Sequence, residues 1–276
     1  MRPAQAVAAA KVNLALVVGE RRDDGLHEIA SVLQRVDVCD RVELEAARVL
    51  AVDGFRDDTI VRRALEELAR EAGVDPSWRA RITKEIPVAA GLGGGSADAA
   101  AALRLANASL ERPLGAEQLH ELAGRLGADV PFFLEPGPKL AEGAGERLTP
   151  VDIPQDFWVL LALPRGATKQ STGAVYGRFD ELGGGAGFAQ RKEALLAALE
   201  HVRRPRDLAA LPANDFAEAA GDVPLADELR AAGAFRVDLS GAGPTVYGLF
   251  HRREDARAAA RKIGRRVRTW VVAPVW

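Results

Sequence analysis

PVAAGLGGGSADAAAAL, residues 87–103, joins a glycine-rich loop to an alanine-rich segment. Such a loop exposes backbone N–H groups at the positive end of a helix dipole, an arrangement that favours binding of a phosphate group. The small alanine side chains allow the segment to pack closely as a helix, and Asp98 suits the start of that helix electrostatically. The sequence therefore predicts a phosphate-binding loop that leads into a buried helix from about Ser96 to Ala108.

The spacing excludes two common phosphate loops. A Walker A loop requires Gly-Lys before the Ser or Thr, whereas Ser96 follows Gly95 directly. The dinucleotide pattern G-x-G-x-x-G requires a further glycine at position 96 or 98, where the chain has Ser96 and Asp98. A glycine-rich turn into a buried helix, without a ligand, is the alternative. Residues 182–188, LGGGAGF, are equally rich in glycine, but an ordinary amphipathic segment follows them, which favours a flexible connector.

The composition is that of a globular protein with room for two packed domains. The chain has 276 residues, of which 48% are hydrophobic and 28% charged. A net charge of -2 does not indicate a broad nucleic-acid surface, and a single cysteine, Cys39, excludes a disulfide framework and a cysteine-based metal site. Because no apolar run approaches the ~20 residues of a membrane span, we expect a cytoplasmic protein without nucleic-acid or membrane partners.

Hydrophobic periodicity predicts strands mixed with helices. The expected strands are residues 5–8, 14–18, 29–35, 41–45, 79–84, 157–163, 245–250 and 267–272. The expected helices, besides the one after the glycine loop, are residues 61–72, 116–126 (with Gly127 as C-cap), 190–201, 226–232 and 253–263. A passage rich in glycine and proline at 136–145 places a domain boundary near residue 150, with domains of residues 1–150 and 151–276. The second domain is predicted to be a two-layer α+β structure.

Two segments near the N-terminus carry polar side chains in informative places. In AKVNLAL, residues 10–16, Lys11 and Asn13 alternate with apolar residues, so both side chains point to one face of a strand. An edge strand with solvated polar residues is the alternative. In RRDDGLHE, residues 21–28, a turn at Asp24-Gly25 is followed by His27, for which an exposed loop histidine is the alternative.

Two later segments also carry residues that could belong to a functional site. In GADVPFF, residues 127–133, Asp129 lies between a helix and Pro131, where a capping or turn aspartate is the alternative reading. In LSGAGPTVYGLF, residues 239–250, Ser240, Gly241 and Gly243 form a small-residue loop before a strand, which by itself would indicate only a tight turn.

Taken in order, AKVNL, PVAAGLGGGSADAA and LSGAGPTVYGLF resemble the GHMP kinase superfamily over essentially the full length of the chain. RRDDGLHE and GADVPFF narrow the resemblance to kinases that phosphorylate the 2-hydroxyl of a cytidine-diphosphate-linked sugar alcohol in the non-mevalonate isoprenoid pathway. The resemblance implies an α+β fold with two domains: an N-terminal ATP-binding domain that contains a left-handed βαβ unit, and a C-terminal two-layer α+β domain. It also implies ATP and Mg²⁺ as cofactors and a small molecule as substrate.

The resemblance assigns roles to individual residues. Lys11 and Asp129 match the catalytic pair, in which the carboxylate would accept the hydroxyl proton and the lysine would neutralise developing charge. The positions implied around the ATP phosphates are Pro87, Val88, Ala89, Ala90, Gly91, Leu92, Gly93, Gly94, Gly95, Ser96 and Ala97, with the Ser96 hydroxyl available to phosphate or Mg²⁺. The implied substrate positions are Asn13, His27 (to the cytosine), Thr172, Ser240, Gly241 and Gly243. Asn214 and Asp215 match a structural Asn-Asp pair.

The chain departs from the family pattern beside the expected base site. Leu26 stands where a tyrosine is usual, and Leu33 stands where a phenylalanine helps to stack the base. A base–aromatic stack is worth about 1–3 kcal/mol, so the sequence leaves open what stacks the cytosine. In the glycine loop, Val88, Ala89 and Ala90 stand where relatives often have methionine and glycine, and alanine resists positive φ.

Two other functions remain open at this level. One is a different GHMP kinase, of the homoserine or mevalonate type, and the other is a non-catalytic nucleotide-binding regulator on the same scaffold. His27 argues against the first, and the retention of Lys11, Asp129 and the glycine loop argues against the second. The sequence does not indicate an oligomeric state.

Overall fold

The computed structural model describes residues 3–55, 60–166, 171–219, 224–264 and 266–276, which form two compact units. The first unit comprises Met1–Ala10, Val38–Val88 and Gly93–Pro136, and the second comprises Lys11–Asp37, Ala89–Leu92 and Gly137–Trp276. The units interleave along the sequence because two long strands, β1 (Ala4–Arg21) and β2 (His27–Ala46), each contribute to both. The boundary near residue 150 stays a prediction.

β1 and β2 pair with each other, and each replaces two shorter strands of the sequence prediction. The two predicted breaks fall where polar residues interrupt the apolar pattern, at Lys11 and Asn13 in β1 and at Asp37 and Asp40 in β2. These residues remain in the strands because hydrogen bonds satisfy their side chains, as Asn13 and Asp40 show below.

In the first unit, β4 (Trp78–Thr83) pairs antiparallel with Arg41–Ala46 of β2 and parallel with β3 (Ala51–Asp53). Helix α1 (Ile60–Ala72) lies between β3 and β4 in the sequence, so the three elements form a β–α–β unit. Leu65 and Leu68 of α1 are fully buried, as the helical period predicts. The left-handed sense of the unit remains an expectation from the resemblance.

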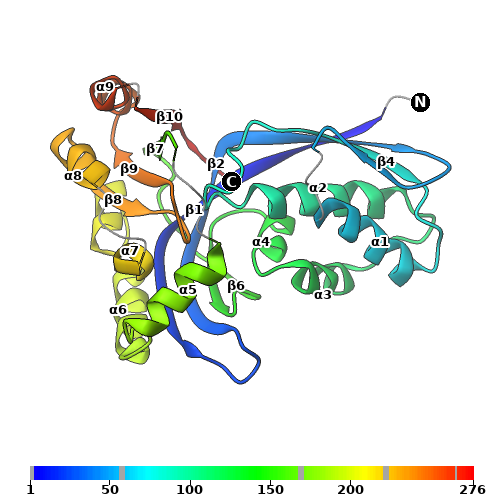
Figure 1. The fold of residues 1–276 in the computed structure, drawn as a ribbon, viewed down its shortest axis with the longest axis horizontal. Coiled ribbons are helices and arrows are strands. Elements are labelled where there is room, and N and C mark those ends of the chain that lie inside the picture. Colours follow the sequence, from blue (N-terminus) through cyan, green and yellow to red (C-terminus); the bar gives the residue numbers. More distant parts are fainter. Residues whose placement is uncertain (1–2, 56–59, 167–170, 220–223, 265) are drawn as a thin grey trace. The chain divides into compact units, whose positions relative to one another are not determined.

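Three more helices complete the first unit: α2 (Gly94–Ser109), α3 (Ala116–Leu126) and α4 (Val130–Leu134). Figure 1 shows α1 to α4 together on one side of β4. The alanines at 97 and 99–102 of α2 are buried, which permits its close contacts with α1 and α4. The bounds of α3 and its C-cap, Gly127, are confirmed.

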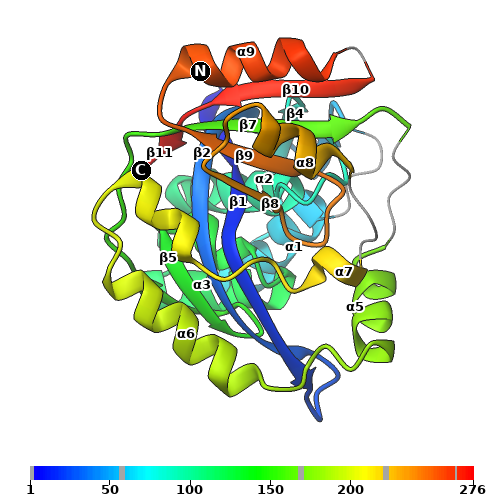
Figure 2. The ribbon, with the colours of Figure 1, turned by 90° about the vertical axis from the view of Figure 1, so that its left-hand side faces the viewer.

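In the second unit, a sheet has the order β10 (Val267–Val272), β7 (Trp158–Pro164), β9 (Val246–Phe250), β8 (Arg236–Leu239), with all neighbours antiparallel. Helices α8 (Pro224–Ala231) and α9 (Arg253–Ile263) cover one face of this sheet (Figure 2). Apolar side chains of both layers share one core. The predicted two-layer α+β arrangement is therefore confirmed.

The rest of the second unit extends β2 and carries short helices. β5 (Lys139–Gly143) and β11 (Pro274–Val275) pair with β2, and β6 (Arg147–Pro150) pairs with β5. The remaining elements are α5 (Thr172–Glu181), α6 (Phe188–Glu200), a 3-10 helix (Pro205–Ala210) and α7 (Phe216–Ala219). Turns over residues 182–187 connect α5 to α6. Of the helices in the described ranges, none is both long and apolar enough to cross a membrane.

Candidate active site

The glycine loop ends at the N-terminus of α2, as predicted. Gly93 is the N-cap with φ +70°, and the helix begins at Gly94, two residues earlier than expected. Ala97 is the residue whose N–H donates to the Gly93 carbonyl (2.9 Å). The N–H groups of Gly94, Gly95 and Ser96 therefore precede the helical hydrogen-bond ladder, in positions from which backbone N–H groups and the helix dipole can stabilise an anion.

A close approach of two loops surrounds Gly91. This residue has φ +78°, and a Cβ atom there would lie 2.2 Å from the Ser240 carbonyl oxygen. The Ser240 hydroxyl, which is buried, donates to the Gly91 carbonyl (3.0 Å). Gly241 and Gly243 also have positive φ, +56° and +76°. The structure thus brings together the glycine loop and the Ser240–Gly243 loop, two segments that the sequence singled out separately.

Ala89 is the one non-glycine residue with positive φ in the part of the chain that the structure describes (φ +62°). This conformation costs an L-residue roughly 1–2 kcal/mol. The substitution at the loop entry noted in the sequence therefore places an alanine where a glycine would be unstrained. Of its neighbours, Pro87 and Ala90 are buried, and Val88 is exposed.

The Lys11 side chain begins a buried chain of hydrogen bonds in the second unit. Its ammonium donates to Asn13 Oδ1 (2.6 Å), Asn13 Nδ2 donates to Ser31 Oγ (2.8 Å), and Ser31 Oγ donates to the Ala15 carbonyl (2.7 Å). The Lys11 N–H donates to the carbonyl of Leu92 in the glycine loop (2.9 Å). Lys11 and Asn13 share a strand face, as predicted, and because each is only 4% exposed, the solvated-edge alternative is wrong.

The Lys11 ammonium also lies next to the Ser240–Gly243 loop. A Cβ atom at Gly241 would be 3.4 Å from Lys11 Nζ and 3.5 Å from Asn13 Oδ1. The absence of a side chain at this position leaves the backbone of the loop against the lysine head group. One buried cation thus adjoins two glycine-rich loops within the second unit.

His27 is buried, so the exposed-loop alternative is wrong. Its Nε2 lies 2.8 Å from Asp180 Oδ1, and its ring centroid is 4.5 Å from that of Tyr176 and 6.4 Å from that of Phe179. These three partners lie on α5 at spacings of three and four residues, which place them on one helix face. The sequence analysis missed them, although their spacing was available as a signal. Thr172, the first residue of α5, is exposed.

Asp129 belongs to the first unit, at the N-cap position of α4. Its backbone has helical dihedral angles (φ −84°, ψ −14°), and its side chain makes no hydrogen bond to the helix cap. The side chain therefore does not cap the helix, whereas the turn half of the alternative holds, because residue 129 lies in a turn. Because Lys11 lies in the second unit, the pairing of Asp129 with Lys11 stays a prediction from the resemblance.

The first unit contains an ionic cluster that the sequence did not predict. Lys84 Nζ donates to Asp40 Oδ2 (2.5 Å) and to Asp98 Oδ2 (2.7 Å). Asp40 Oδ1 accepts the N–H groups of Glu85 (2.6 Å) and Ile86 (2.8 Å). A Cβ atom at Gly94 would lie 3.3 Å from Lys84 Nζ, so the cluster lies against the start of α2.

The prediction that Asp98 lies in the first turn of the helix is wrong. Because α2 begins at Gly94, Asp98 is its fifth residue rather than a residue of the first turn, and its carboxyl is buried against Lys84. Burial raises the pKa of Asp98 to about 7, and the attraction of Lys84 opposes that rise. Asp98 Oδ1 has no hydrogen-bond partner among the residues that the structure describes. Asp98 thus lies against Lys84, away from the first turn where a carboxylate would stabilise the helix dipole.

Comparisons with known proteins agree with these features. Residues 59–137 match the family model described as GHMP kinases N terminal domain, and residues 223–269 match that described as GHMP kinases C terminal. A relative from Anaeromyxobacter sp. (strain Fw109-5), named 4-diphosphocytidyl-2-C-methyl-D-erythritol kinase, is 40% identical over 95% of this chain and 87% of its own. A relative of the same name from Geobacter sp. (strain M21) is 38% identical over 100% and 99%. The chain belongs to the 4-diphosphocytidyl-2-C-methyl-D-erythritol kinase family.

Solved structures of related kinases confirm the GHMP kinase fold. A crystal structure of 4-(cytidine 5'-diphospho)-2C-methyl-D-erythritol kinase matches 99% of this chain and 100% of its own, with a TM-score of 0.79 and 30% identity. A crystal structure of mevalonate kinase has a TM-score of 0.78 but 12% identity, which shows a common fold alone. This member of the diphosphocytidyl-methylerythritol kinase family is therefore a small-molecule phosphotransferase, and the homoserine and mevalonate alternatives are not favoured.

The structure shows the surroundings of Leu26 and Leu33, the two positions where this kinase lacks the usual aromatic residues. Leu26 is 54% exposed beside the buried His27, and Leu33 is buried in β2. Tyr176 presents the aromatic ring closest to His27 among the ring pairs of the described residues. The aromatic surface at this histidine therefore comes from α5 rather than from the residues next to His27.

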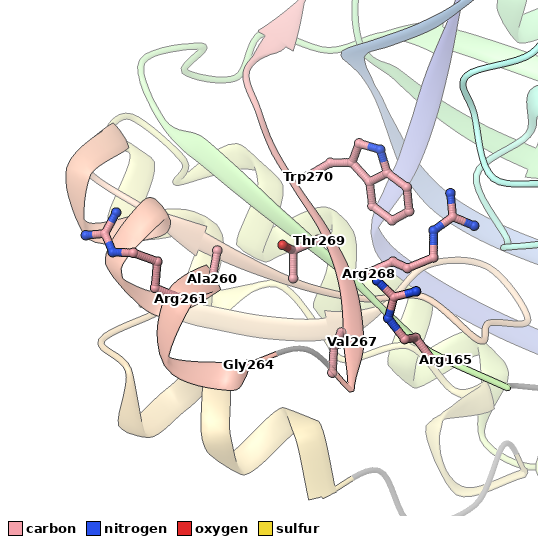
Figure 3. Close-up of a pocket in the computed structure, with 8 residues that line it drawn as sticks. All are labelled: Arg165, Ala260, Arg261, Gly264, Val267, Arg268, Thr269 and Trp270. Atoms are coloured by element: carbon pink, nitrogen blue, oxygen red, sulfur yellow. The ribbon is translucent and has the colours of Figure 1, made fainter.

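The second unit also has a recess that contains no predicted site residue. Its lining residues are Arg165, Ala260, Arg261, Gly264, Val267, Arg268, Thr269 and Trp270. Figure 3 shows Arg268 and Trp270 on one side of β10 and Thr269 on the other, as the alternation of a strand requires. The Arg268 guanidinium lies 4.9 Å from the Trp270 ring centroid. We assign this recess no part in phosphoryl transfer.

Gly91→Ala should weaken ATP binding. The new Cβ would collide with the Ser240 carbonyl at 2.2 Å, and alanine disfavours φ +78°. We expect the KM for ATP to rise roughly tenfold or more, equivalent to about 1.4 kcal/mol. Gly95→Ala is the matched comparison, because among the described residues its Cβ would meet Ile60 alone, at 3.6 Å. Equal KM values for the two variants would contradict the close-approach argument.

Asp98→Asn should change the pH dependence of stability. Because the folded pKa of Asp98 is about 7 and its ordinary value is 3.8, its stabilising contribution is present below about pH 4 and is lost as the pH rises through 7. Wild-type stability should thus fall relative to the variant between about pH 4 and pH 8, by roughly 1–4 kcal/mol. Urea unfolding measures this, with Asp53→Asn, a half-exposed carboxylate paired with Arg79, as the control. The same pH trend in Asp98→Asn and the wild type would contradict the assignment.

Proposed function

We propose that this chain transfers the γ-phosphoryl group of ATP to the 2-hydroxyl of 4-diphosphocytidyl-2-C-methyl-D-erythritol. The observation that carries the proposal is the buried Lys11, hydrogen-bonded to Asn13 and adjacent to both glycine-rich loops. A fixed cation beside a phosphate-binding loop is the arrangement that phosphoryl transfer requires, since catalysis there is mostly positioning and charge stabilisation. The relatives named for this reaction align over nearly the whole chain.

ATP binds at the glycine loop in this proposal. The N–H groups of Gly94, Gly95 and Ser96 and the dipole of α2 hold the phosphates, and the close approach at Gly91 fixes the preceding turn. The Ser96 hydroxyl is available to a phosphate oxygen or to Mg²⁺. Mg²⁺ is taken up with ATP as part of the substrate, since Mg²⁺ is commonly bound through substrate phosphates and one or two protein oxygens.

Asp129 and Lys11 carry the chemical step. The Asp129 carboxylate accepts the proton of the substrate 2-hydroxyl while that oxygen forms a bond to the γ-phosphorus. The bond from the γ-phosphorus to the β–γ bridging oxygen breaks, and its electron pair leaves with ADP. The Lys11 ammonium, oriented by Asn13, neutralises the charge that develops on the transferred group.

The cytidine end of the substrate binds at His27. The imidazole hydrogen-bonds the cytosine, and the Tyr176 ring, 4.5 Å from the imidazole, offers a surface on which the base stacks. Thr172, four residues before Tyr176 on α5, faces the same substrate, and the Ser240–Gly243 loop closes on it. We also propose that the enzyme acts in the cytoplasm.

Substrate choice tests the proposal directly. ADP release with Mg²⁺ and ATP should occur with 4-diphosphocytidyl-2-C-methyl-D-erythritol and not with homoserine, mevalonate or phosphomevalonate. Turnover of another panel member alone would retain the kinase assignment and refute the substrate. Retained ATP binding without turnover of any compound would favour a nucleotide-binding regulator.

Asp129→Asn should abolish turnover and leave the Kd for ATP within about twofold of the wild-type value, because the base is lost and the phosphate loop is intact. General acid–base catalysis contributes about 10²–10⁴-fold in typical enzymes, which sets the expected loss in kcat. Asp152→Asn serves as a control carboxylate outside the proposed site. Wild-type kcat in Asp129→Asn would refute its role as the base.

A further inference from the structure

We infer that Asp180 determines base specificity by fixing the tautomer of His27, so that the imidazole accepts a hydrogen bond from cytosine and rejects uracil. The inference rests on the proposed function, because it concerns how the same site recognises its substrate. It assigns a positioning role to a residue that the sequence pattern did not single out.

The contact between the two side chains is direct, and it joins a buried imidazole to a carboxylate that is 41% exposed. His27 Nε2 lies 2.8 Å from Asp180 Oδ1, and the His27 side chain is only 6% exposed. Tyr176 lies beside the imidazole with an interplanar angle of 38°, and Phe179 meets it edge-on at 76°. No other hydrogen bond of the imidazole is found among the residues that the structure describes. The ring therefore has one fixed partner, on Nε2.

The helix that supplies Asp180 is itself held in place. Tyr176 and Phe179 pack edge-on against Phe216, with centroid distances of 4.6 Å and 5.5 Å. Val175 and Phe179 are buried in the core of the second unit. These contacts hold the face of α5 that carries Asp180, so the helix backbone presents the partly exposed carboxylate to His27.

The chemistry of the pair determines which nitrogen carries the proton. A neutral imidazole has one donor and one acceptor nitrogen, and an ionised carboxylate can only accept. Asp180 therefore places the proton on Nε2 and leaves Nδ1 as an acceptor. The 4-amino group of cytosine is a donor and suits this acceptor, whereas uracil, like thymine, has a carbonyl oxygen at that position, which would face the Nδ1 lone pair.

A site built around such an acceptor discriminates strongly. An unmatched buried polar pair leaves both groups without a hydrogen bond, and sites of this kind reject the wrong analogue by factors far above those of apolar pockets. We therefore expect the wild type to prefer the cytidine compound over its uridine counterpart by roughly 100-fold or more in kcat/KM.

Variants at Asp180 test the inference, with Glu181→Gln as the matched control. Glu181 is the next residue on α5, and its side chain is 69% exposed and paired with Arg178. In Asp180→Asn the amide can donate to Nε2 and so permits the tautomer with the proton on Nδ1, which matches uracil. The cytidine-to-uridine ratio of kcat/KM should fall roughly tenfold or more in Asp180→Asn and in Asp180→Ala. The KM for ATP and the ratio in Glu181→Gln should not change.

The tautomer can be measured without turnover. Nitrogen-15 chemical shifts of the His27 ring in the full chain should show the proton on Nε2 in the wild type and a mixture of tautomers in Asp180→Asn. A wild-type proton on Nδ1, or an unchanged substrate ratio in both active Asp180 variants, would overturn the inference. A wild type that binds ATP and does not phosphorylate the cytidine compound would instead refute the proposed function, which keeps the two failures distinct.

Discussion

The buried ammonium of Lys11 is the constraint to which much of the second unit conforms. A charge in a protein interior is costly unless hydrogen bonds and partners compensate it. The compensation here runs along the pair of long strands: Asn13 of β1 accepts from Lys11 and donates to Ser31 of β2, which in turn bonds the Ala15 carbonyl. A shift of one residue between the strands would turn Ser31 to the opposite face. The hydrogen bonds that compensate the buried Lys11 ammonium therefore require this register of β1 against β2.

The same polar chain continues to the loop that contacts Gly91. The Asn13 carbonyl accepts from the buried Tyr247 hydroxyl (2.9 Å), and Arg236, which contacts that hydroxyl, pairs with Asp238 (2.8 Å). Asp238 accepts the Asn214 N–H (3.0 Å), and Asn214 Nδ2 donates to the Gly241 carbonyl (2.8 Å).

The two residues of the Asn-Asp pair, Asn214 and Asp215, bind different parts of the second unit. Asn214 holds the Ser240–Gly243 loop, and Asp215 accepts from the Val18 N–H (2.8 Å) and from Arg191 (3.2 Å). Loop and lysine are fixed by one network within the second unit, which agrees with the structural role expected for this pair.

Features encoded by neighbouring residues could be predicted from the sequence, and features that depend on distant partners could not. The bounds of α3 follow from local periodicity and a glycine C-cap, and the glycine loop that leads into the buried helix α2 follows from its own composition. The burial of His27 depends on Asp180, 153 positions away, and that of Asp98 depends on Asp40 and Lys84. The dependence on distant partners also explains why β1 and β2 were each predicted as two shorter strands. A polar residue within a strand indicates a break unless its buried hydrogen-bond partner is known.

The glycine loop shows how far local chemistry can be read. At Gly91, glycine is required twice, by φ +78° and by the carbonyl that a Cβ would meet at 2.2 Å, and the chain has glycine. At Ala89 only the first requirement applies, because φ is +62°, and the chain has alanine. Strain of about 1–2 kcal/mol can be carried by a fold that over-determines the position, as the buried Ala90 and the Lys11–Leu92 hydrogen bond do here. A steric collision with backbone cannot be carried in this way. Ala89 and Gly91 therefore have similar backbone angles but different surroundings. A side chain fits at residue 89, whereas at residue 91 the Ser240 backbone occupies the space that a side chain would need.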